Sequence, residues 1–285
     1  MKRSDFRFLD PLRVRWAEVD MQKIVFNGHY LMYFDTAVAG YWRALALPYH
    51  ETMEHLQGDL YVRKATLEYL GSARYDDQLA VGIRCARIGS SSMLIQAAVF
   101  RGEICLVHGE LVYVFADPVT QTSRPVPVAL RNVLTAYEAG EPMFEVRVST
   151  WAEQGAAARA MRHAVFAAEQ GLAADLMADE NDGVAVHAMA FNRFGLALAS
   201  GRLLPSTDGV ARIGRLATMA TVRGAGLGAA VLQSLMQTAR ARGDREILLQ
   251  ARPSAVRFFQ RAGFVEQRTV YQEAGIPHQD MRCAL

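Results

Sequence analysis

The sequence predicts a two-domain protein of the α+β class, and three observations lead to this prediction. The chain has 285 residues, enough for two domains of about 100–200 residues each. Turn-forming residues cluster at 117–127 and again at 140–142, on either side of a short helical pattern, as expected for a linker. One long apolar-faced helix and several strands precede this linker, whereas strands and helices alternate after it. We therefore expect one domain at residues 1–140 and a second at residues 141–285.

The first domain is predicted to hold one long helix against an antiparallel sheet. Residues 28–46 carry apolar side chains at helical spacing, namely Tyr30, Phe34, Ala37, Val38, Tyr41 and Leu45. Segments rich in β-formers and bounded by short turns predict strands at 61–70, 78–88, 93–101 and 104–115. A buried helix on a meandering sheet is an α+β arrangement. A further strand is expected at 15–20, where it ends in Asp20.

The second domain is predicted to begin with a strand at 144–149 and a helix at 152–169. Three more strands are expected at 184–191, 197–204 and 211–219. A glycine-rich loop follows and opens a helix with one apolar face, made of Leu227, Val231, Leu232, Leu235, Met236 and Ala239. Gly243 stands where a helix C-terminal cap belongs. A strand at 246–251, a short helix at 254–261 and a last strand at 264–271 complete the prediction.

Composition and charge exclude several classes of protein. The net charge is +2, and acidic and basic residues are balanced in both halves, so no nucleic-acid partner is expected. No apolar run approaches the roughly 18–20 residues that span a bilayer, and the first residues lack the apolar core of a signal peptide. We therefore expect a cytoplasmic protein with no membrane partner. Cys85, Cys105 and Cys283 fit neither a disulfide framework nor a zinc spacing, and no metal is predicted.

The loop Arg223-Gly224-Ala225-Gly226-Leu227-Gly228 lies between a predicted strand and a predicted helix. Glycines let the backbone approach a ligand, and the free N–H groups of a helix start favour an anion such as a pyrophosphate. A P-loop is excluded, because no lysine follows Lys64. The dinucleotide pattern Gly224-x-Gly226-x-x-Ala229 fits formally. However, the next strand ends in Gln250-Ala251 rather than in an acid, and fewer than 60 residues follow the loop.

The same loop resembles the Arg/Gln-x-x-Gly-x-Gly/Ala pyrophosphate loop of the GNAT acetyltransferases. Residues 258–264, 161–170 and 271–278 resemble, in the same order, segments of the small bacterial GNAT proteins of the ElaA type. The resemblance implies a mixed sheet flanked by helices and a site for acetyl-CoA built from backbone. It implies that Leu216, Ala217 and Thr218 pair with the pantetheine arm. The pyrophosphate would be held by Arg223, Gly224, Ala225, Gly226, Leu227 and Gly228.

This domain departs from the family pattern at one position that matters for catalysis. Acyl transfer needs a base to free the amine and an acid to protonate the departing thiolate. The family's usual tyrosine acid falls on Phe259, which has no proton to donate. Tyr271 or His278 could act as the acid, and Glu169 or His187 as the base. Alternatively, water protonates the thiolate, or the domain only binds CoA.

Asp20 is the candidate catalytic acid of the first domain. An acid before a helix commonly caps its N-terminus, but Asn27 and Gly28 are better placed for that role. A carboxylate can also attack a thioester or deprotonate a water molecule. Meanwhile, the N–H groups of a helix start can polarise the thioester carbonyl. Asn27 and His29 are candidates to position the water or the thioester, although either could serve the helix start alone.

Residues 14–35 resemble the hotdog thioesterases, in particular the branch of 4-hydroxybenzoyl-CoA thioesterase and YbgC/FadM. Residues 67–77 and 89–92 match later segments of that family. The resemblance implies a hotdog fold, in which an antiparallel sheet wraps a long central helix, and it places the family's catalytic acid on Asp20. It also implies a homodimer or homotetramer formed through this domain. Lys23 replaces a common glycine, Ile24 a frequent histidine and Gly71 a frequent proline.

The two resemblances together predict a bifunctional protein that acts on CoA thioesters. One half is expected to hydrolyse acyl-CoA, and the other to transfer an acyl group from acetyl-CoA or another acyl-CoA to an amine acceptor of unknown identity. The alternative is a thioesterase whose second half is a non-catalytic CoA-binding regulator. A scaffold built of two degenerate folds is a third possibility, but a scaffold has no need for Asp20 and the glycine loop.

Overall fold

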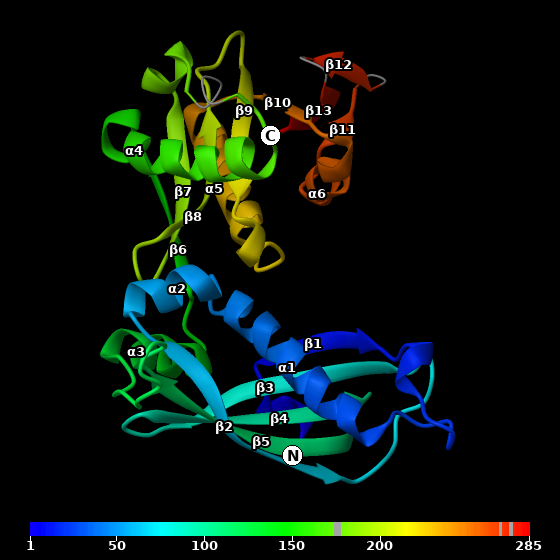
Figure 1. The fold of residues 1–285 in the computed structure, drawn as a ribbon. Coiled ribbons are helices and arrows are strands. Elements are labelled where there is room, and N and C mark those ends of the chain that lie inside the picture. The colour runs from blue at the N-terminus through cyan, green and yellow to red at the C-terminus, as the bar shows by residue number, and fades with distance from the viewer. Residues whose placement is uncertain (174–177, 268–269, 274–275) are drawn as a thin grey trace. The chain divides into compact units, whose positions relative to one another are not determined.

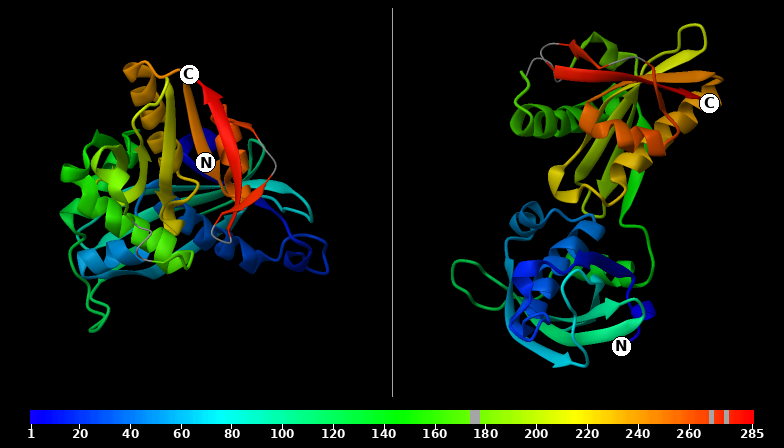
Figure 2. Two further views of the ribbon diagram at one scale, coloured as in Figure 1. Left: turned by 90° about the horizontal axis from the view of Figure 1, so that it is seen from above. Right: turned by 90° about the vertical axis from the view of Figure 1, so that its right-hand side faces the viewer.

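The computed structural model describes residues 1–173, 178–267, 270–273 and 276–285, and it forms two compact units (Figures 1 and 2). The first unit is Met1–Met143 and the second is Phe144–Leu285. Four residues of predicted segments lie outside the described residues: Arg268 and Thr269 of the strand at 264–271, and Ala274 and Gly275 of the segment 271–278.

The first unit is a five-stranded antiparallel sheet with a long helix packed against it. The sheet has the order β1-β3-β4-β5-β2, with β1 at Phe8–Arg13, β2 at Asp59–Tyr69, β3 at Gln78–Ile88, β4 at Ser92–Arg101 and β5 at Ile104–Ala116. Helix α1, Asn27–Ala44, contacts β1, β3 and β4 (Figure 1). It buries Tyr30, Tyr33, Phe34, Ala37, Gly40, Tyr41 and Trp42. The predicted hotdog arrangement is confirmed.

Three details of the first unit differ from the prediction. Residues 15–20 do not form a strand: Trp16–Glu18 is a short 3-10 helix, because the Glu18 carboxylate reaches back to the Arg15 N–H group at 2.7 Å and closes a turn. The strand of this region lies earlier, at β1. Helix α2, Tyr49–Leu56, was not predicted. Helix α3, Val128–Glu138, agrees with the helical pattern of the linker region and packs against β3.

The second unit is a mixed sheet covered by helices, as the GNAT resemblance implies. Its order is β11-β13-β10-β9-β8-β7-β6. The strands are β6 (Phe144–Ser149), β7 (Val186–Asn192), β8 (Ala197–Leu203), β9 (Val210–Thr218), β10 (Glu246–Ala251), β11 (Val265–Glu266) and β13 (Ile276–Ala284). Strand β12, Tyr271–Glu273, pairs with β13 alone. The pair β9–β10 is parallel, and the other pairs are antiparallel.

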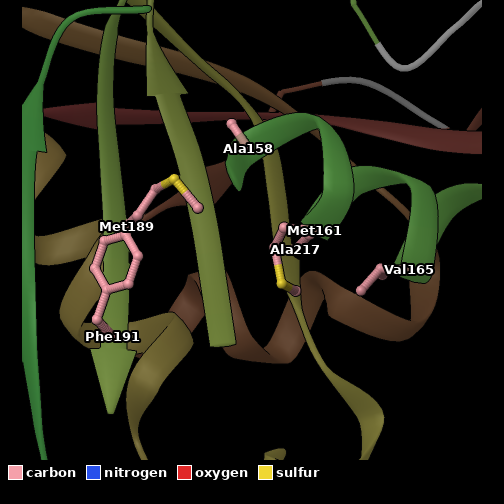
Figure 3. Packing of buried hydrophobic residues seen from close by; sticks show 6 residues of the cluster. All are labelled: Ala158, Met161, Val165, Met189, Phe191 and Ala217. Carbon is pink, nitrogen blue, oxygen red and sulfur yellow. The ribbon is translucent and has the colours of Figure 1, made fainter. Parts of the chain in front are cut away.

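Helices cover both faces of this sheet. Helix α4, Trp151–Arg162, continues into a π-helical segment, η3, at His163–Glu169. Together they pack over a cluster of Ala158, Met161, Val165, Met189, Phe191 and Ala217 (Figure 3). Helix α5, Leu227–Arg242, lies on the other face, where a Cβ atom at Gly201 would meet Val231 and Leu235. Helix α6 spans Val256–Arg261.

The end of the second unit differs from the prediction. The expected single strand at 264–271 is divided between the short strands β11 and β12, and the long final strand β13 was not expected. Strand β13 pairs with β10, β11 and β12, and it therefore holds the C-terminal segment to the sheet.

Candidate functional site

Asp20 begins a tight turn that leads back toward α1. Its backbone N–H donates to the Ile24 carbonyl at 2.9 Å, and its carbonyl accepts from the Lys23 N–H at 3.0 Å. Lys23 adopts a φ of +62°, a left-handed conformation that suits glycine better than lysine. A glycine, which the resemblance to the hotdog thioesterases implies at this position, would adopt this conformation without strain.

The Asp20 carboxylate keeps one oxygen available. Its Oδ1 accepts the Gln22 N–H at 2.7 Å, whereas Oδ2 has no hydrogen-bond partner among the described residues. The side chain is partly exposed at the turn. The turn is joined to the helix start, because Val19 bridges Val25 and the Phe26 N–H donates to the Glu18 carbonyl at 2.9 Å. Asp20 is therefore held next to a helix N-terminus with an oxygen free for chemistry.

The start of α1 has no side-chain cap from any described residue. Phe26 is the N-cap residue, with an extended backbone, and Asn27 is the first helical residue. The expectation that Asn27 or Gly28 caps the helix is wrong, because the chain turns into the helix one residue earlier. Uncapped N–H groups at a helix start can polarise an oxygen that carries negative charge. The Asn27 side chain is exposed, and the His29 ring lies edge-on to Phe26 at 5.8 Å.

Glu18 is a buried acid that the sequence analysis did not single out. Its side chain is 2% exposed, is paired with the Arg15 guanidinium at 2.6 Å and accepts the Tyr33 hydroxyl at 2.8 Å. Burial raises the pKa of Glu18, but the hydrogen bonds from the Arg15 N–H and from Tyr33 outweigh burial and hold it below its ordinary value. Glu18 thus fixes the segment before Asp20 onto α1.

An open edge on β9 is the main feature of the second unit's candidate site. Strands β9 and β10 pair only from Val210–Arg212 with Glu246–Leu248. Beyond Arg212, β9 continues to Thr218 and β10 to Ala251 without pairing with each other. On that side the backbone from Leu216 to Thr218 has no strand partner, although the Thr218 carbonyl accepts from Arg223 Nε at 3.1 Å. An extended ligand could add to the sheet here as a further strand does.

The glycine loop leads from this open edge into α5. Gly224 and Gly226 have φ values of +90° and +88°, and no described atom lies within 4 Å of where their Cβ atoms would be. At Gly228, a Cβ atom would lie 2.9 Å from the Thr218 hydroxyl. Gly226 is the N-cap residue of α5, and no described side chain caps this helix start. The first N–H groups of the helix are thus available to an anion.

The Arg223 side chain is engaged within the protein. Its two terminal nitrogens contact both carboxylate oxygens of Glu169 at 2.7 Å each, and its Nε donates to the Thr218 carbonyl at 3.1 Å. Glu169, one of the two candidate bases, is therefore held by a bidentate ion pair at the end of η3. In the loop backbone, the N–H groups of Arg223 and Ala225 donate to the Ala220 and Val222 carbonyls at 3.3 Å, whereas those of Gly224 and Gly226 have no partner among the described residues.

The other acid and base candidates lie in different settings. His187 is 1% exposed, its Nε2 contacts the Asp182 carbonyl at 2.9 Å, and burial lowers its pKa. The Tyr271 hydroxyl donates to Asp280 at 2.7 Å and accepts from Gln250, at the end of β10, at 2.8 Å. The His278 ring contacts the Ile276 carbonyl. Phe259 is buried against Phe258 and Phe264. No hydrogen bond among the described residues joins these candidates to one another.

A buried network of charges under α4 also escaped the sequence analysis. Asp182 accepts from Arg162 at 2.7 Å and from Arg202 at 2.8 Å, and all three side chains are nearly inaccessible. Asp179 holds Arg202 through two bonds of 2.6 and 2.7 Å and Arg215 through one of 3.0 Å. These hydrogen bonds, those from Arg202 foremost, hold the pKa of Asp179 well below its ordinary range.

Comparisons with known proteins match the two units to two families. Residues 22–107 match the thioesterase superfamily, and residues 149–285 match a family described as acetyltransferase (GNAT) domain. Acyl-CoA thioesterase YbgC of Haemophilus influenzae is 26% identical over 36% of this chain and 75% of its own length. Acyl-CoA thioester hydrolase YbgC of Escherichia coli is 24% identical over 42% and 90%. A solved structure, described as "putative N-acetyltransferase from Lactobacillus plantarum", is 30% identical over 50% of this chain and 99% of its own, with a TM-score of 0.48.

No group of three or more histidine, cysteine, aspartate or glutamate side chains in the described part of the chain is arranged to hold a metal ion. Within the same residues, no helix has the length and apolar character needed to cross a membrane.

Proposed function

Because residues 22–107 belong to the thioesterase superfamily and residues 149–285 to the GNAT acetyltransferase family, we propose that this protein is bifunctional. The first unit hydrolyses acyl-CoA to a free acid and CoA. The second unit binds acetyl-CoA or another acyl-CoA and transfers its acyl group to an amine. The observation that carries the proposal is that each unit pairs an uncapped helix start with the residues expected to act there.

Asp20 drives hydrolysis in the first unit. As a general base, its free oxygen takes a proton from water while the water oxygen attacks the thioester carbonyl. The C–S bond then breaks, and the products are a carboxylic acid and the CoA thiol. As a nucleophile, the same oxygen attacks the thioester carbonyl, the C–S bond breaks, and CoA leaves as a thiolate that takes up a proton. Water then opens the resulting acyl anhydride, which releases the acid and restores Asp20. In both routes, the N–H groups at the start of α1 stabilise the developing oxyanion, and Asn27 and His29 position the water or the thioester.

A panel of acyl-CoA substrates tests this assignment through the rate of thiol release. We expect Asp20→Asn to lower kcat by a factor of at least about 100, because the general base or nucleophile is lost. Asp76→Asn is the matched control: Asp76 is exposed, its side chain pairs with Arg13 alone among the described residues, and its φ of +68° is one that asparagine tolerates. Equal rates for wild type and Asp20→Asn would overturn the hydrolytic role, and the panel also identifies the preferred acyl chain.

The first unit is proposed to work as a homodimer or homotetramer. Strand β2 lies at the end of the sheet order, and residues 61–66 along it are all exposed. An edge strand of this length with exposed Tyr61 and Val62 is a surface on which another copy can pair. Hotdog sheets normally complete their active sites across a dimer, so the exposed faces of β2 support this assembly.

The second unit is proposed to hold the CoA thioester along the open edge of β9. Leu216, Ala217 and Thr218 pair with the pantetheine arm, and the N–H groups of the loop from Arg223 to Gly228 bind the pyrophosphate. The amine attacks the thioester carbonyl and gives up a proton to a base, for which Glu169 and His187 are the candidates. The C–S bond breaks, and the thiolate takes up a proton. Tyr271, next to the end of β10, is a candidate donor. Water is the alternative donor, because Phe259 cannot serve.

The second candidate function is a CoA-binding regulator, and two observations favour it. Phe259 replaces the usual acid, and Glu169 is engaged with Arg223. Measuring acetyl-CoA binding by calorimetry together with acetyl transfer to a panel of amines separates the two functions. Acetyl transfer that depends on the second unit would exclude the regulatory role. Tight binding of acetyl-CoA without acetyl transfer, together with a changed rate of thioester hydrolysis, would establish it.

A further inference from the structure

The strand that is proposed to hold the CoA arm contains a strained arginine. Arg215 of β9 has a φ of +53°, and the register with β8 shifts on either side of it: Arg202 pairs with Gly214, whereas Ser200 pairs with Ala217. A non-glycine residue in this conformation costs roughly 1 kcal/mol or more and is maintained where the surroundings enforce it. The bulge turns the Arg215 side chain toward Asp179.

The Arg215 guanidinium has N–H donors that make no hydrogen bond within the described residues. Its Nη2 contacts Asp179 at 3.0 Å, and its Nε and Nη1 have no hydrogen-bond partner among the described residues. The side chain is 25% exposed, whereas that of Arg202, which shares Asp179, is 9% exposed. Both oxygens of Asp179 already accept hydrogen bonds from arginine. The accessible end of the buried network therefore offers donors to an anion rather than acceptors to a cation.

A second polar group lies on the same face of the sheet. Ser200 is 2% exposed, and its hydroxyl has no hydrogen-bond partner among the described residues. Ser200 and Arg202 are two residues apart on β8, so their side chains lie on one face, and Ser200 is paired with Ala217, two residues beyond Arg215. Buried hydroxyls are normally hydrogen-bonded. A ligand that carries acceptor oxygens would satisfy both Ser200 and Arg215.

A pantetheine arm that runs along β9 would place its thioester near the bulge at Arg215. The pyrophosphate loop follows the end of β9, so an arm that pairs with Thr218, Ala217 and Leu216 runs back along the strand toward the bulge. Its reactive end then lies beside Arg215, where the acceptor amine must also bind. An arginine fork recognises a carboxylate through two parallel hydrogen bonds.

Resting on the proposed transferase function, we propose that Arg215 binds the carboxylate of the acyl acceptor. The second unit therefore acylates amines that also carry a carboxylate, the chemical class of amino acids. The carboxylate bonds to Nε and Nη1 of Arg215, and the Asp179 ion pair keeps the guanidinium oriented. The amine of the same molecule is then directed toward the thioester at the bulge.

Pairs of amines that differ only in the carboxylate test this inference. Phenylalanine is compared with 2-phenylethylamine and with phenylalaninamide, and lysine with cadaverine, using acetyl-CoA and detection of the acetylated product by mass spectrometry. We expect kcat/KM at least tenfold higher for the carboxylate-bearing member of each pair. Arg215→Asn, in which asparagine tolerates the positive φ, should raise KM for that member at least tenfold and leave the Kd of acetyl-CoA unchanged.

A control variant and the pattern of rates distinguish the possible outcomes. Arg212→Gln replaces an exposed arginine of the same strand and should leave both values unchanged. Equal rates within each wild-type pair, or an equal loss for both members in Arg215→Asn, would overturn the role of Arg215 while acyl transfer itself stands. No product from any amine would instead overturn the transferase function, and the inference with it. Equal rates within the wild-type pairs would overturn the inference even if Arg215→Asn does not fold.

Discussion

Asp182 is the residue on which the buried charges of the second unit converge. It is 1% exposed and receives hydrogen bonds from Arg162 and Arg202. Without this carboxylate, buried Arg162 loses an ion pair that offsets its charge, whereas Arg202 keeps its two hydrogen bonds to Asp179. The network therefore depends on this one carboxylate more strongly than any exposed ion pair depends on its partners.

Replacing Asp182 by asparagine should strongly destabilise the second unit. We expect Asp182→Asn to lower its free energy of unfolding by about 3 kcal/mol, as for a buried ion pair that loses one partner. Urea denaturation followed by hydrogen exchange of β7 and β8 measures this loss. Glu145→Gln, which breaks the exposed ion pair with Arg147, should cost at most about 1 kcal/mol. Equal losses in both variants would show that the network adds little to stability.

His187 should make the stability of the second unit depend on pH. Burial lowers the pKa of His187 from its ordinary 6.5, so the unfolded chain takes up a proton on this residue at a higher pH than the folded chain does. Stability should therefore fall as the pH decreases below about 6.5, where only the unfolded histidine is protonated. Hydrogen exchange of β7 between pH 7 and pH 5 measures the effect. In His187→Gln this dependence should be weaker, and an unchanged slope would contradict the prediction.

At the scale of the element, helix α5 is bounded by two glycines that have similar φ values but different proposed roles. Gly226 begins the helix and Gly243 ends it, with φ values of +88° and +85°. No described atom lies within 4 Å of where either Cβ would be. An alanine at either position therefore suffers the same backbone strain, roughly 1–2 kcal/mol. Only Gly226 belongs to the proposed pyrophosphate loop.

This pair separates binding from backbone strain. Gly226→Ala should weaken acetyl-CoA binding at least tenfold, because the strained loop no longer presents its N–H groups to the pyrophosphate and the new methyl group crowds it. Gly243→Ala should show a similar loss of thermal stability and bind acetyl-CoA as the wild type does. Calorimetric titration of acetyl-CoA provides the measurement. Weaker binding in both variants would mean that the loop acts through stability alone.

At the scale of the whole molecule, the exposed edge of the first unit predicts assembly. One chain has a mass of 31.5 kDa, and we expect a native mass of at least twice this value in multi-angle light scattering. A charge at an exposed apolar position of β2 should oppose pairing of the edge. Val62→Glu should thus lower both the native mass and the rate of thioester hydrolysis. Ile104→Glu, at an equally exposed position at the start of β5, is the control, and a monomeric wild type would contradict the prediction.

Sequence patterns by themselves determined the features that depend on local order. The α+β class, helix α1 and the apolar face of α5 follow from side-chain spacing. The glycine loop was recognised because closely spaced glycines between a strand pattern and a helix pattern are typical of a turn. Asp20 was proposed as the catalytic acid because the residues that carry the family resemblance lie close together in the sequence around it. The turn before Asp20 was not predicted, because the 3-10 helix at Trp16–Glu18 is closed by a hydrogen bond from the Arg15 N–H to the Glu18 carboxylate that residue spacing does not reveal.

Only the tertiary structure decided which distant residues meet. Arg223 pairs with Glu169, 54 residues away, and Arg215 with Asp179, 36 residues away. Nothing in the spacing of these residues indicates contact, because pairing over such distances depends on how α4 and the strands pack. The left-handed backbone of Arg215 likewise results from a mismatch between β8 and β9, not from a residue that prefers it. The sequence therefore predicted where CoA is proposed to bind, whereas the charges proposed to select the acceptor emerged only when separate segments folded together.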